Sequence, residues 1–309
     1  MTSCAGVRWW LGLVLLFGGC DRVFGLDGRN DGDGDDASID GDGSSSGPDL
    51  DLDGIGDAAD PCIAARLDGS SDYDLDGIRN DMDPCPLDDT TSISGDADGD
   101  SIPDRCDPFA AAEGDSVRCF MKFSNSDLNT LLWRERGATS EWMLPSNQLA
   151  TSDIDSTASL VSTLRLEGSD VPTFDVDLTI DGDSSLMIEH AVQIWGRAAD
   201  AVDQSDIGCQ LTSDPAATRL QIINGGGGDL AQDSATGVAF PLGVAIRMRL
   251  TYAVGTAGTN VFCSATANGR TWTVSTRATI PATGRFGFGV LAGQVSITGL
   301  AIYDRSQLP

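Results

Sequence analysis

The sequence predicts an all-β fold for residues 116–309, with irregular aspartate-rich repeats before it. The prediction for the C-terminal part rests on short runs in which apolar and polar residues alternate, as in Phe174–Ile180 and Ile246–Tyr252. Alternation of period two buries one face of a strand and leaves the other in water, which is typical of antiparallel sheets packed in pairs. The prediction for the preceding part rests on aspartates that recur in fixed phase between residues 49 and 107. About 190 residues provide room for one core of a dozen or so strands.

Residues 1–20 are typical of an export signal. One basic residue, Arg8, precedes the apolar run Trp9–Phe17, which is too short to span a bilayer, and small residues then lead to Cys20. This ending resembles the lipobox of bacterial lipoproteins, and the resemblance implies cleavage before Cys20 and lipid attachment to its thiol. A plain secretory signal is the alternative. The expected location is the bacterial envelope, at the outer membrane or cell surface, with the membrane leaflet left open.

Residues 21–48 have the composition of a disordered acidic linker, rich in Asp, Gly and Ser. Between Asp21 and Asp115, 28 acidic residues stand against five arginines, so this part carries −23 of the chain's net charge of −28. Carboxylates at this density repel one another unless divalent cations neutralise them. The same charge makes nucleic acid and anionic membrane surfaces poor partners, so we expect no binding to nucleic acid.

One pattern occurs three times in residues 49–115. Each copy places oxygen-bearing side chains at positions 1, 3, 5, 9 and 12 of a loop, and an isoleucine at position 7 offers its backbone carbonyl. Ca²⁺ takes about 6 to 8 oxygen ligands in a flexible shell, which such a loop provides. The candidate ligands are Asp49, Asp51, Asp53, Ile55, Asp57 and Asp60 in the first copy, Asp72, Asp74, Asp76, Ile78, Asn80 and Asp83 in the second, and Asp96, Asp98, Asp100, Ile102, Asp104 and Asp107 in the third.

Position 6 of the loop needs a sharp turn. Gly54 and Gly77 supply it in the first two copies, whereas the third copy has Ser101, which predicts a strained turn or a lower affinity. A solvated acidic linker is the alternative for the whole stretch, but a linker has no reason to keep Asp, Gly and Ile in phase three times.

The residues after each loop indicate the scaffold. Pro61, Pro84 and Pro108 directly follow the last ligand, and no apolar helical periodicity lies between the copies, so paired helices are not expected. Asp-Pro-Cys recurs at Asp60–Cys62 and Asp83–Cys85. These features resemble the thrombospondin type 3 repeat, which implies Ca²⁺ as the cofactor and a chain wrapped around ions in place of a hydrophobic core. The alternative resemblance is a dockerin, which depends on helices. We expect a segment that is expanded without calcium and forms a stiff stalk with it.

The cysteines predict a disulfide framework. Once Cys4 and Cys20 are assigned to the leader, an even number remains, which in an exported protein allows fifteen pairings. The remaining six are Cys62, Cys85, Cys106, Cys119, Cys209 and Cys263. We favour the pairs Cys62–Cys85, Cys106–Cys119 and Cys209–Cys263. A zinc site is not supported, because the chain has no Cys-x-x-Cys pair and a single histidine, His190.

The predicted strands of the C-terminal domain are separated by clusters of Gly, Asn, Asp and Ser. They are residues 118–123, 159–166, 174–180, 186–195, 244–252 and 270–276. The glycine-rich ending Gly284–Tyr303 resembles the closing strand pair of a concanavalin A-like jelly roll, the laminin-G-like sandwich of lectins and glucanases. The resemblance implies that fold for residues 116–309. Another all-β sandwich is the alternative.

Enzyme activity is the weaker prediction for this domain. Jelly-roll glucanases resemble one another in a Glu-x-Asp-x-x-Glu strand, and the sequence contains none. Asp175 and Asp177 share one strand face, which we expect to be a solvated outer face because Phe174 and Val176 take the inner one. His190, in an apolar run, is expected in the core.

Recognition is the stronger prediction. Four tryptophans can stack on a sugar ring, although at least two are expected to fill the sandwich: Trp133, Trp142, Trp195 and Trp272. The loop Asn224–Asp229 is expected to be a long hairpin turn. The sequence therefore predicts an exported, lipid-anchored calcium-binding protein whose stalk presents a sandwich for carbohydrate or cell-surface recognition and adhesion. A polysaccharide-acting glycoside hydrolase and a structural envelope protein without ligand are the alternatives.

Overall fold

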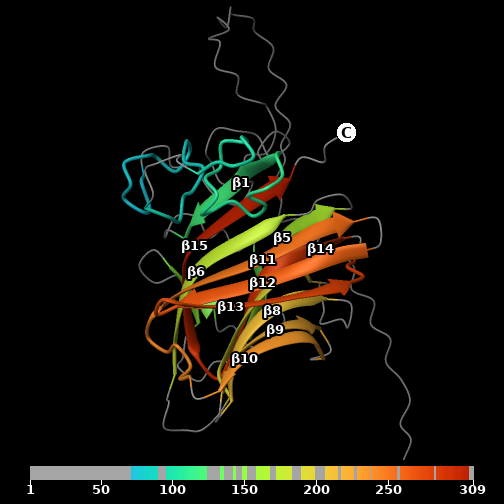
Figure 1. Cartoon of the computed structure of the whole chain (residues 1–309). Coiled ribbons are helices and arrows are strands. Elements are labelled where there is room, and N and C mark those ends of the chain that lie inside the picture. Colours follow the sequence, from blue (N-terminus) through green and yellow to red (C-terminus); the bar gives the residue numbers. More distant parts are fainter. Residues whose placement is uncertain are drawn as a thin grey trace, which may run out of the picture. The chain divides into compact units, whose positions relative to one another are not determined.

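The computed structural model describes residues 71–89, 95–123, 133–135, 142–143, 148–151, 158–167, 172–182, 189–198, 206–214, 217–225, 228–236, 238–255, 258–281 and 283–305. The predicted leader, the acidic linker and the first repeat copy lie outside these residues. The described residues belong to one compact unit, Ser44–Pro309. They contain fifteen strands and no helix (Figure 1), and hence no helix long and apolar enough to cross a membrane.

Two antiparallel sheets form a sandwich. The strands of sheet A are β1 (Asp115–Lys122), β3 (Trp142–Met143), β4 (Leu149–Thr151), β6 (Thr173–Asp181), β11 (Ala245–Gly255), β12 (Gly258–Ala267), β13 (Arg270–Ala278) and β15 (Gln294–Arg305). The strands of sheet B are β2 (Trp133–Glu135), β5 (Ala158–Glu167), β7 (Ala191–Ala198), β8 (Ile207–Asp214), β9 (Ala217–Asn224), β10 (Asp229–Thr236) and β14 (Thr283–Leu291).

The connections make the sandwich a jelly roll. Sheet A has the order β13-β12-β11-β6-β15-β4-β3, with β1 also paired to β15, and sheet B has the order β10-β9-β8-β7-β14-β5-β2. The chain changes sheet at each step from β4 to β7 and again from β13 to β15, and these crossings hold the two sheets face to face. The predicted all-β jelly-roll fold class is confirmed.

The main core lies between the sheets and follows the predicted alternation. Phe174, Val176 and Leu178 of β6 point into it and are at most 2% exposed. Alternate residues of β11, from Ile246 to Tyr252, are equally buried. The disulfide Cys209–Cys263 joins β8 to β12 across this core, which confirms the predicted pair.

One predicted strand begins later than expected. Of the run 186–195, residues 186–188 lie outside the described part of the chain, Glu189 and His190 are not in a strand, and β7 starts at Ala191. His190 lies just before the strand, and its backbone N–H donates to Ser213 Oγ at 2.8 Å. Its ring lies beside Phe240 and is almost fully buried, so the predicted core position of His190 is confirmed.

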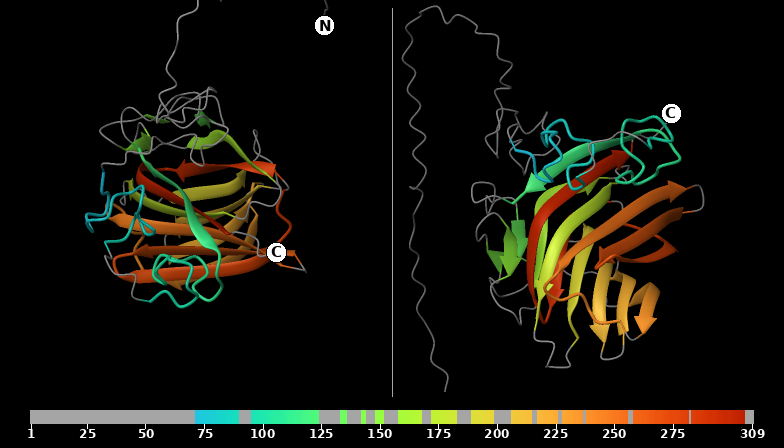
Figure 2. Two further views of the ribbon diagram at one scale, coloured as in Figure 1. Left: turned by 90° about the horizontal axis from the view of Figure 1, so that it is seen from above. Right: turned by 60° about the vertical axis from the view of Figure 1, so that its left-hand side comes forward.

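The second and third repeat copies lie against the outer face of sheet A, beside β1 and β15 (Figures 1 and 2). A second hydrophobic cluster, which we call the docking core, forms there. It contains Cys85, Leu87, Ile102 and Cys106 from the repeats and Phe120, Ala301 and Tyr303 from the sheet. The predicted stalk is therefore wrong for these two copies, because their apolar side chains bury against the sandwich and do not extend away from it.

Strand β15 contributes to both cores through a bulge. Val295 and Ile297 face the main core, and the register with β6 shifts between Ile297 and Gly299. Beyond the shift, Leu300 faces the main core and Ala301 faces the docking core.

Candidate functional site

The second and third aspartate loops have the same internal hydrogen bonds, 24 residues apart. In both, the carboxylate at position 1 accepts bonds from the N–H groups of positions 4 and 6, at 2.7 to 3.0 Å. The donors are Leu75 and Gly77 to Asp72 in the second copy, and Gly99 and Ser101 to Asp96 in the third. These bonds curl each loop so that its other carboxylates turn inward.

Positions 4 and 6 have left-handed backbone in both copies. The φ angles are 66° at Leu75 and 94° at Gly77 in the second copy, and 87° at Gly99 and 81° at Ser101 in the third. Glycine adopts this conformation freely, whereas a residue with Cβ is strained in it. Each loop thus has one strained position, and the predicted strain at Ser101 is confirmed.

Two groups of three carboxylates converge inside the loops. Each group has side-chain oxygens that all lie within 4.8 Å of one another. The groups are Asp72, Asp74 and Asp76 in the second copy and Asp96, Asp98 and Asp100 in the third. Positions 1, 3 and 5 are therefore brought together as the sequence predicts.

The second loop has buried carboxylate oxygens without a hydrogen-bond donor. They are Oδ2 of Asp74, Oδ2 of Asp76 and Oδ2 of Asp83 at position 12, a residue that is only 4% exposed. An unsatisfied buried carboxylate oxygen costs several kcal/mol, and a hard divalent cation bound by oxygens removes that cost. These residues fit a calcium-type cation.

The electrostatics of the second loop agree with its geometry. Burial, with the charges of neighbouring aspartates, raises the pKa of Asp74 to about 6 and that of Asp83 to about 7. Clustered carboxylates without a counter-charge favour the protonated form, and a bound cation reverses this preference.

The side chain at position 9 is not part of the group formed by positions 1, 3 and 5. Oδ1 of Asn80 accepts the N–H of Tyr73 at 2.9 Å, and Oδ1 of Asp104 accepts the N–H of Ala97 at 2.8 Å. The residue at position 9 thus braces the loop at position 2. The backbone carbonyls of position 7, and the whole of the first copy, stay predictions.

Two arginines of β11 dock the repeats on sheet A. Arg247 forms an ion pair with Asp177 and donates to the backbone carbonyl of Leu87. Arg249 pairs with Asp175 at 2.6 Å. Asp175 and Asp177 do lie on the outer face, but the predicted solvated environment is wrong for Asp175, which is 1% exposed because the repeats cover it.

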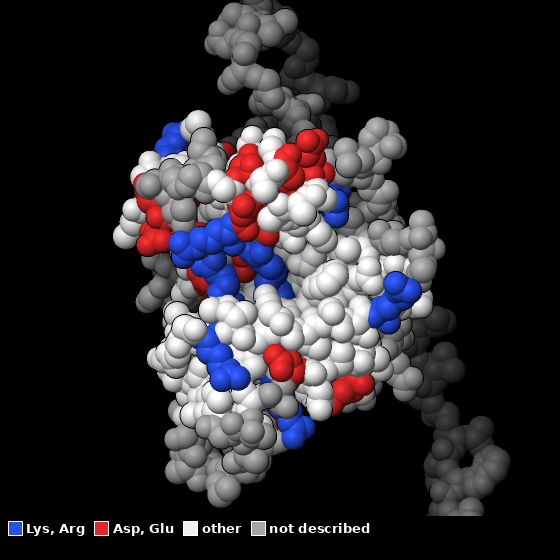
Figure 3. Space-filling model, in the orientation of Figure 1, with Lys and Arg blue, Asp and Glu red and all other residues white. Residues whose placement is uncertain are grey.

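Arg249 also contacts the end of the third loop. Its guanidinium donates to the backbone carbonyl of Cys106 at 2.8 Å and to that of Asp107 at 3.3 Å. Basic and acidic side chains consequently meet along the border between the repeats and the sandwich (Figure 3).

The disulfide Cys85–Cys106 joins the second and third copies, with Cα atoms 5.7 Å apart. The predicted pairs Cys62–Cys85 and Cys106–Cys119 are therefore wrong, because docking brings the ends of the two loops together. Cys119 is itself disulfide-bonded.

The close approach of repeats and sheet requires a glycine. A Cβ atom at Gly299 would lie 2.7 Å from Leu87 Cδ2 and 3.1 Å from the ring of Tyr73. The Tyr73 hydroxyl donates to Thr298 Oγ1 at 2.8 Å. Side chains of the second copy thus sit directly over the bulge of β15.

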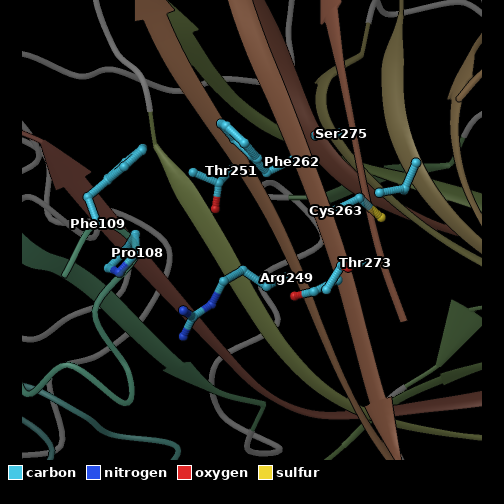
Figure 4. Close-up of a pocket in the computed structure, with 10 residues that line it drawn as sticks. Pro108, Phe109, Arg249, Thr251, Phe262, Cys263, Thr273 and Ser275 are labelled. Carbon is cyan, nitrogen blue, oxygen red and sulfur yellow. The ribbon is translucent and has the colours of Figure 1, made fainter. Parts of the chain in front are cut away.

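A cleft of about 460 Å³ opens where the third copy meets β11, β12 and β13 (Figure 4). Pro108 and Phe109 form one wall. Phe262, 43% exposed, and the hydroxyls of Thr251 and Thr273 lie on the strands opposite. An exposed aromatic ring among hydroxyl groups suits a polar ligand with an apolar face.

The tryptophans contribute little to this surface. Trp272 lies in the main core and Trp142 packs partly buried against it, which confirms that at least two tryptophans fill the sandwich. Trp195 is 6% exposed and lies in a separate small cluster with Ala198 and Ile223. The predicted hairpin is also confirmed, because β9 ends at Asn224 and β10 begins at Asp229. Within this turn the N–H of Gly228 donates to Asn224 Oδ1.

The chain was compared with known proteins. No protein-family model and no curated protein matches it. Among solved structures, peanut lectin is 8% identical over 62% of this chain and 98% of its own, with a TM-score of 0.47. Lectin II from Ulex europaeus is 10% identical over 62% and 100%, with a TM-score of 0.48, and a legume lectin-like domain from Entamoeba histolytica is 10% identical over 57% and 92%, with a TM-score of 0.44. The resemblances to thrombospondin repeats and to lipoproteins stay predictions.

Proposed function

We propose that this chain is an exported calcium-binding protein whose aspartate loops support a jelly-roll domain that recognises carbohydrate or another cell-surface ligand. One observation carries the calcium part. In the second loop, one carboxylate oxygen each of positions 1, 3 and 5 converges within 4.8 Å of the others, and positions 3, 5 and 12 each have a buried oxygen without a donor. A buried cluster of this kind requires protons or a cation, and oxygen ligands alone favour Ca²⁺.

Calorimetric titration of the full chain with Ca²⁺ tests this part. We expect several ions to bind, with Mg²⁺ a weak competitor because it demands a rigid octahedral shell. Asp76→Asn should weaken one site by about tenfold or more, since it removes a charge from the ligand set.

Asp81→Asn is the matched control. Asp81 lies in the same loop but pairs with the exposed Arg79, outside the cluster, so the same loss of charge should leave calcium binding unchanged. Absence of binding at millimolar calcium would refute the calcium part of the proposal.

The cleft beside the third copy supports the recognition part. It combines the exposed ring of Phe262 with hydroxyl groups, which suits a sugar ring better than a wholly apolar ligand. Glycan-array binding by the full chain in calcium should fall strongly for Phe262→Ala. Leu230→Ala is the control, because Leu230 is a similarly exposed apolar residue, at 40%, and does not line the cleft.

The same samples separate the alternatives. Release of reducing sugars from polysaccharide would favour a hydrolase. Absence of both glycan binding and release would leave a structural envelope protein and refute the recognition part.

Export and lipid attachment at Cys20 belong to the same proposal and rest on the residues of the leader. The disulfides Cys85–Cys106 and Cys209–Cys263 support export, since such bonds persist in oxidising compartments. Incorporation of labelled fatty acid that is lost in Cys20→Ser would agree with the anchor, whereas equal labelling of both would contradict it.

A further inference from the structure

The third loop differs from the second where the chain leaves it for the sandwich. The N–H of Ala112 donates to Asp98 Oδ2 at 2.9 Å, and the N–H of Asp115 donates to Asp100 Oδ2 at 2.8 Å. The equivalent oxygens of the second loop have no donor. The segment that begins β1 thus closes over the third loop and brings a further carboxylate to it.

That carboxylate belongs to Asp115, the first residue of β1. Asp115 is 5% exposed, and neither of its oxygens has a hydrogen-bond donor. Its side chain lies with those of Asp100 and Asp107 in a third group, in which one carboxylate oxygen from each residue lies within 4.8 Å of the other two. Asp107 is also 5% exposed, and its Oδ2 has no donor.

Three carboxylates this close cannot all stay ionised in a buried place without a positive charge among them. Arg305, the arginine of β15, is paired with Asp115 in the sheet register, and its charge favours the ionised form of Asp115. Its guanidinium carbon lies 4.5 Å from the ring centre of Phe109. Arg305 does not donate a hydrogen bond to either oxygen of Asp115, which leaves a cation or a shared proton to balance the three carboxylates.

We propose that Asp100, Asp107 and Asp115 hold a calcium-type cation, so that the sandwich itself contributes a ligand to the third repeat. The inference rests on the proposed calcium function and extends it to a residue outside the repeat pattern. The bridging ion joins the loop to the first pair of the β1–β15 ladder, Asp115 and Arg305. Calcium then does more than shape the loop, because it fixes the repeat to the sandwich.

The test compares calcium titrations of the full chain with those of Asp115→Asn. The amide keeps the shape of the side chain and removes its charge, so we expect one fewer ion, or one site weakened about tenfold or more. Glu113→Gln is the control. Glu113 is exposed, lies two residues before Asp115 and is outside the group, so the loss of its charge should not change calcium binding.

A second measurement covers the case in which Asp115→Asn fails to fold. Hydrogen exchange of the unaltered chain in calcium and in EDTA should show the amides of residues 112–118 protected by calcium, together with those of the loops. Protection of residues 72–83 alone would overturn the inference, and would favour a shared proton at Asp115.

The two proposals fail in different ways. If the unaltered chain binds no calcium, the proposed function fails, and this inference fails with it. If it binds calcium and Asp115→Asn binds the same number of ions with the same affinity, only the inference is overturned.

Discussion

The second and third aspartate loops share a sequence pattern and a hydrogen-bond pattern but have different surroundings. In the second loop, Asp74 and Asp76 keep oxygens without donors. In the third loop, the equivalent Asp98 and Asp100 accept N–H groups from the segment that begins β1. The comparison shows that the repeat determines the curl of the loop, whereas the chain that follows determines which of its carboxylates also accept backbone N–H groups from outside the loop.

Substitution of the two docking arginines should give the largest difference between the second and third copies. Arg249 supports the third copy and pairs with Asp175, whose side chain is 1% exposed, whereas Arg247 supports the second and pairs with Asp177, whose side chain is 24% exposed. Arg249→Met leaves a buried unpaired charge, so we expect a loss of about 3 to 5 kcal/mol in the free energy of unfolding. Arg247→Met should cost less, about 1 to 2 kcal/mol.

Urea denaturation in calcium measures both losses. Adding Asp175→Leu to Arg249→Met should restore stability, because it removes the unpaired charge. Equal losses for the two single variants would show that the two arginines do not differ in the way that their burial indicates.

The disulfide Cys85–Cys106 ties the second copy to the third. Replacing both cysteines by serine should lower the free energy of unfolding by about 2 to 4 kcal/mol. Hydrogen exchange should quicken more in residues 71–83 than in residues 95–107, because the third copy keeps its hydrogen bonds to β1. Equal acceleration in both copies would contradict the difference between them.

The pH dependence of stability in the calcium-free protein tests whether both copies contain carboxylates whose ionised form is destabilised. Burial raises the pKa of Asp83 in the second copy to about 7, and that of Asp115, beside the third, also to about 7. A raised pKa stabilises the folded state below the unfolded value, about 4, and this stabilisation is lost as pH rises through 7. In EDTA we expect the free energy of unfolding to fall by roughly 2 kcal/mol between pH 4 and 7.

Calcium should reverse that trend, because its ligands must be deprotonated. Thermal melts across this pH range, with and without calcium, measure the effect. A calcium-free protein whose stability rises with pH over the same range would contradict the assignment.

The smallest expected effect concerns the left-handed turn at position 6. Ser101→Gly should stabilise the third loop and Gly77→Ser should destabilise the second, each by about 0.5 to 1 kcal/mol. The control is Ala97→Gly, because Ala97 does not have a positive φ and its replacement should not stabilise the loop. Calcium titration and melting of the three variants provide the comparison, and a destabilising Ser101→Gly would contradict it.

Much of the architecture could be predicted from local pattern. The fixed spacing of the aspartates predicted that positions 1, 3 and 5 converge. The alternation of apolar and polar residues predicted which residues of β6 face the core. Strand β12 was harder to predict, because its buried face combines Val261 and Cys263 with the small Ala265, which gives little hydrophobic contrast with its neighbours.

The rest depends on contacts between parts distant in sequence. Alternation placed Asp175 on the outer face of β6, but only the docked repeats explain why it is buried. The same docking decides that Cys106 pairs with Cys85. Asp115 was not among the predicted ligands, because it lies outside the repeat phase, as the last residue of the predicted repeat segment 49–115.

The bulge of β15 lies where this strand contacts both the main core and the repeats. Ile297 and Leu300 both face the main core although they are three residues apart, so Thr298 and Gly299 share one outward place between them. Loss of the single codon for Thr298 would restore strict alternation and leave the inward residues where they are. It would also remove the hydroxyl that Tyr73 contacts and shift the strand beneath the repeats. A deletion of one residue here would therefore weaken the seat of the second copy while the inward face of β15 kept its pattern.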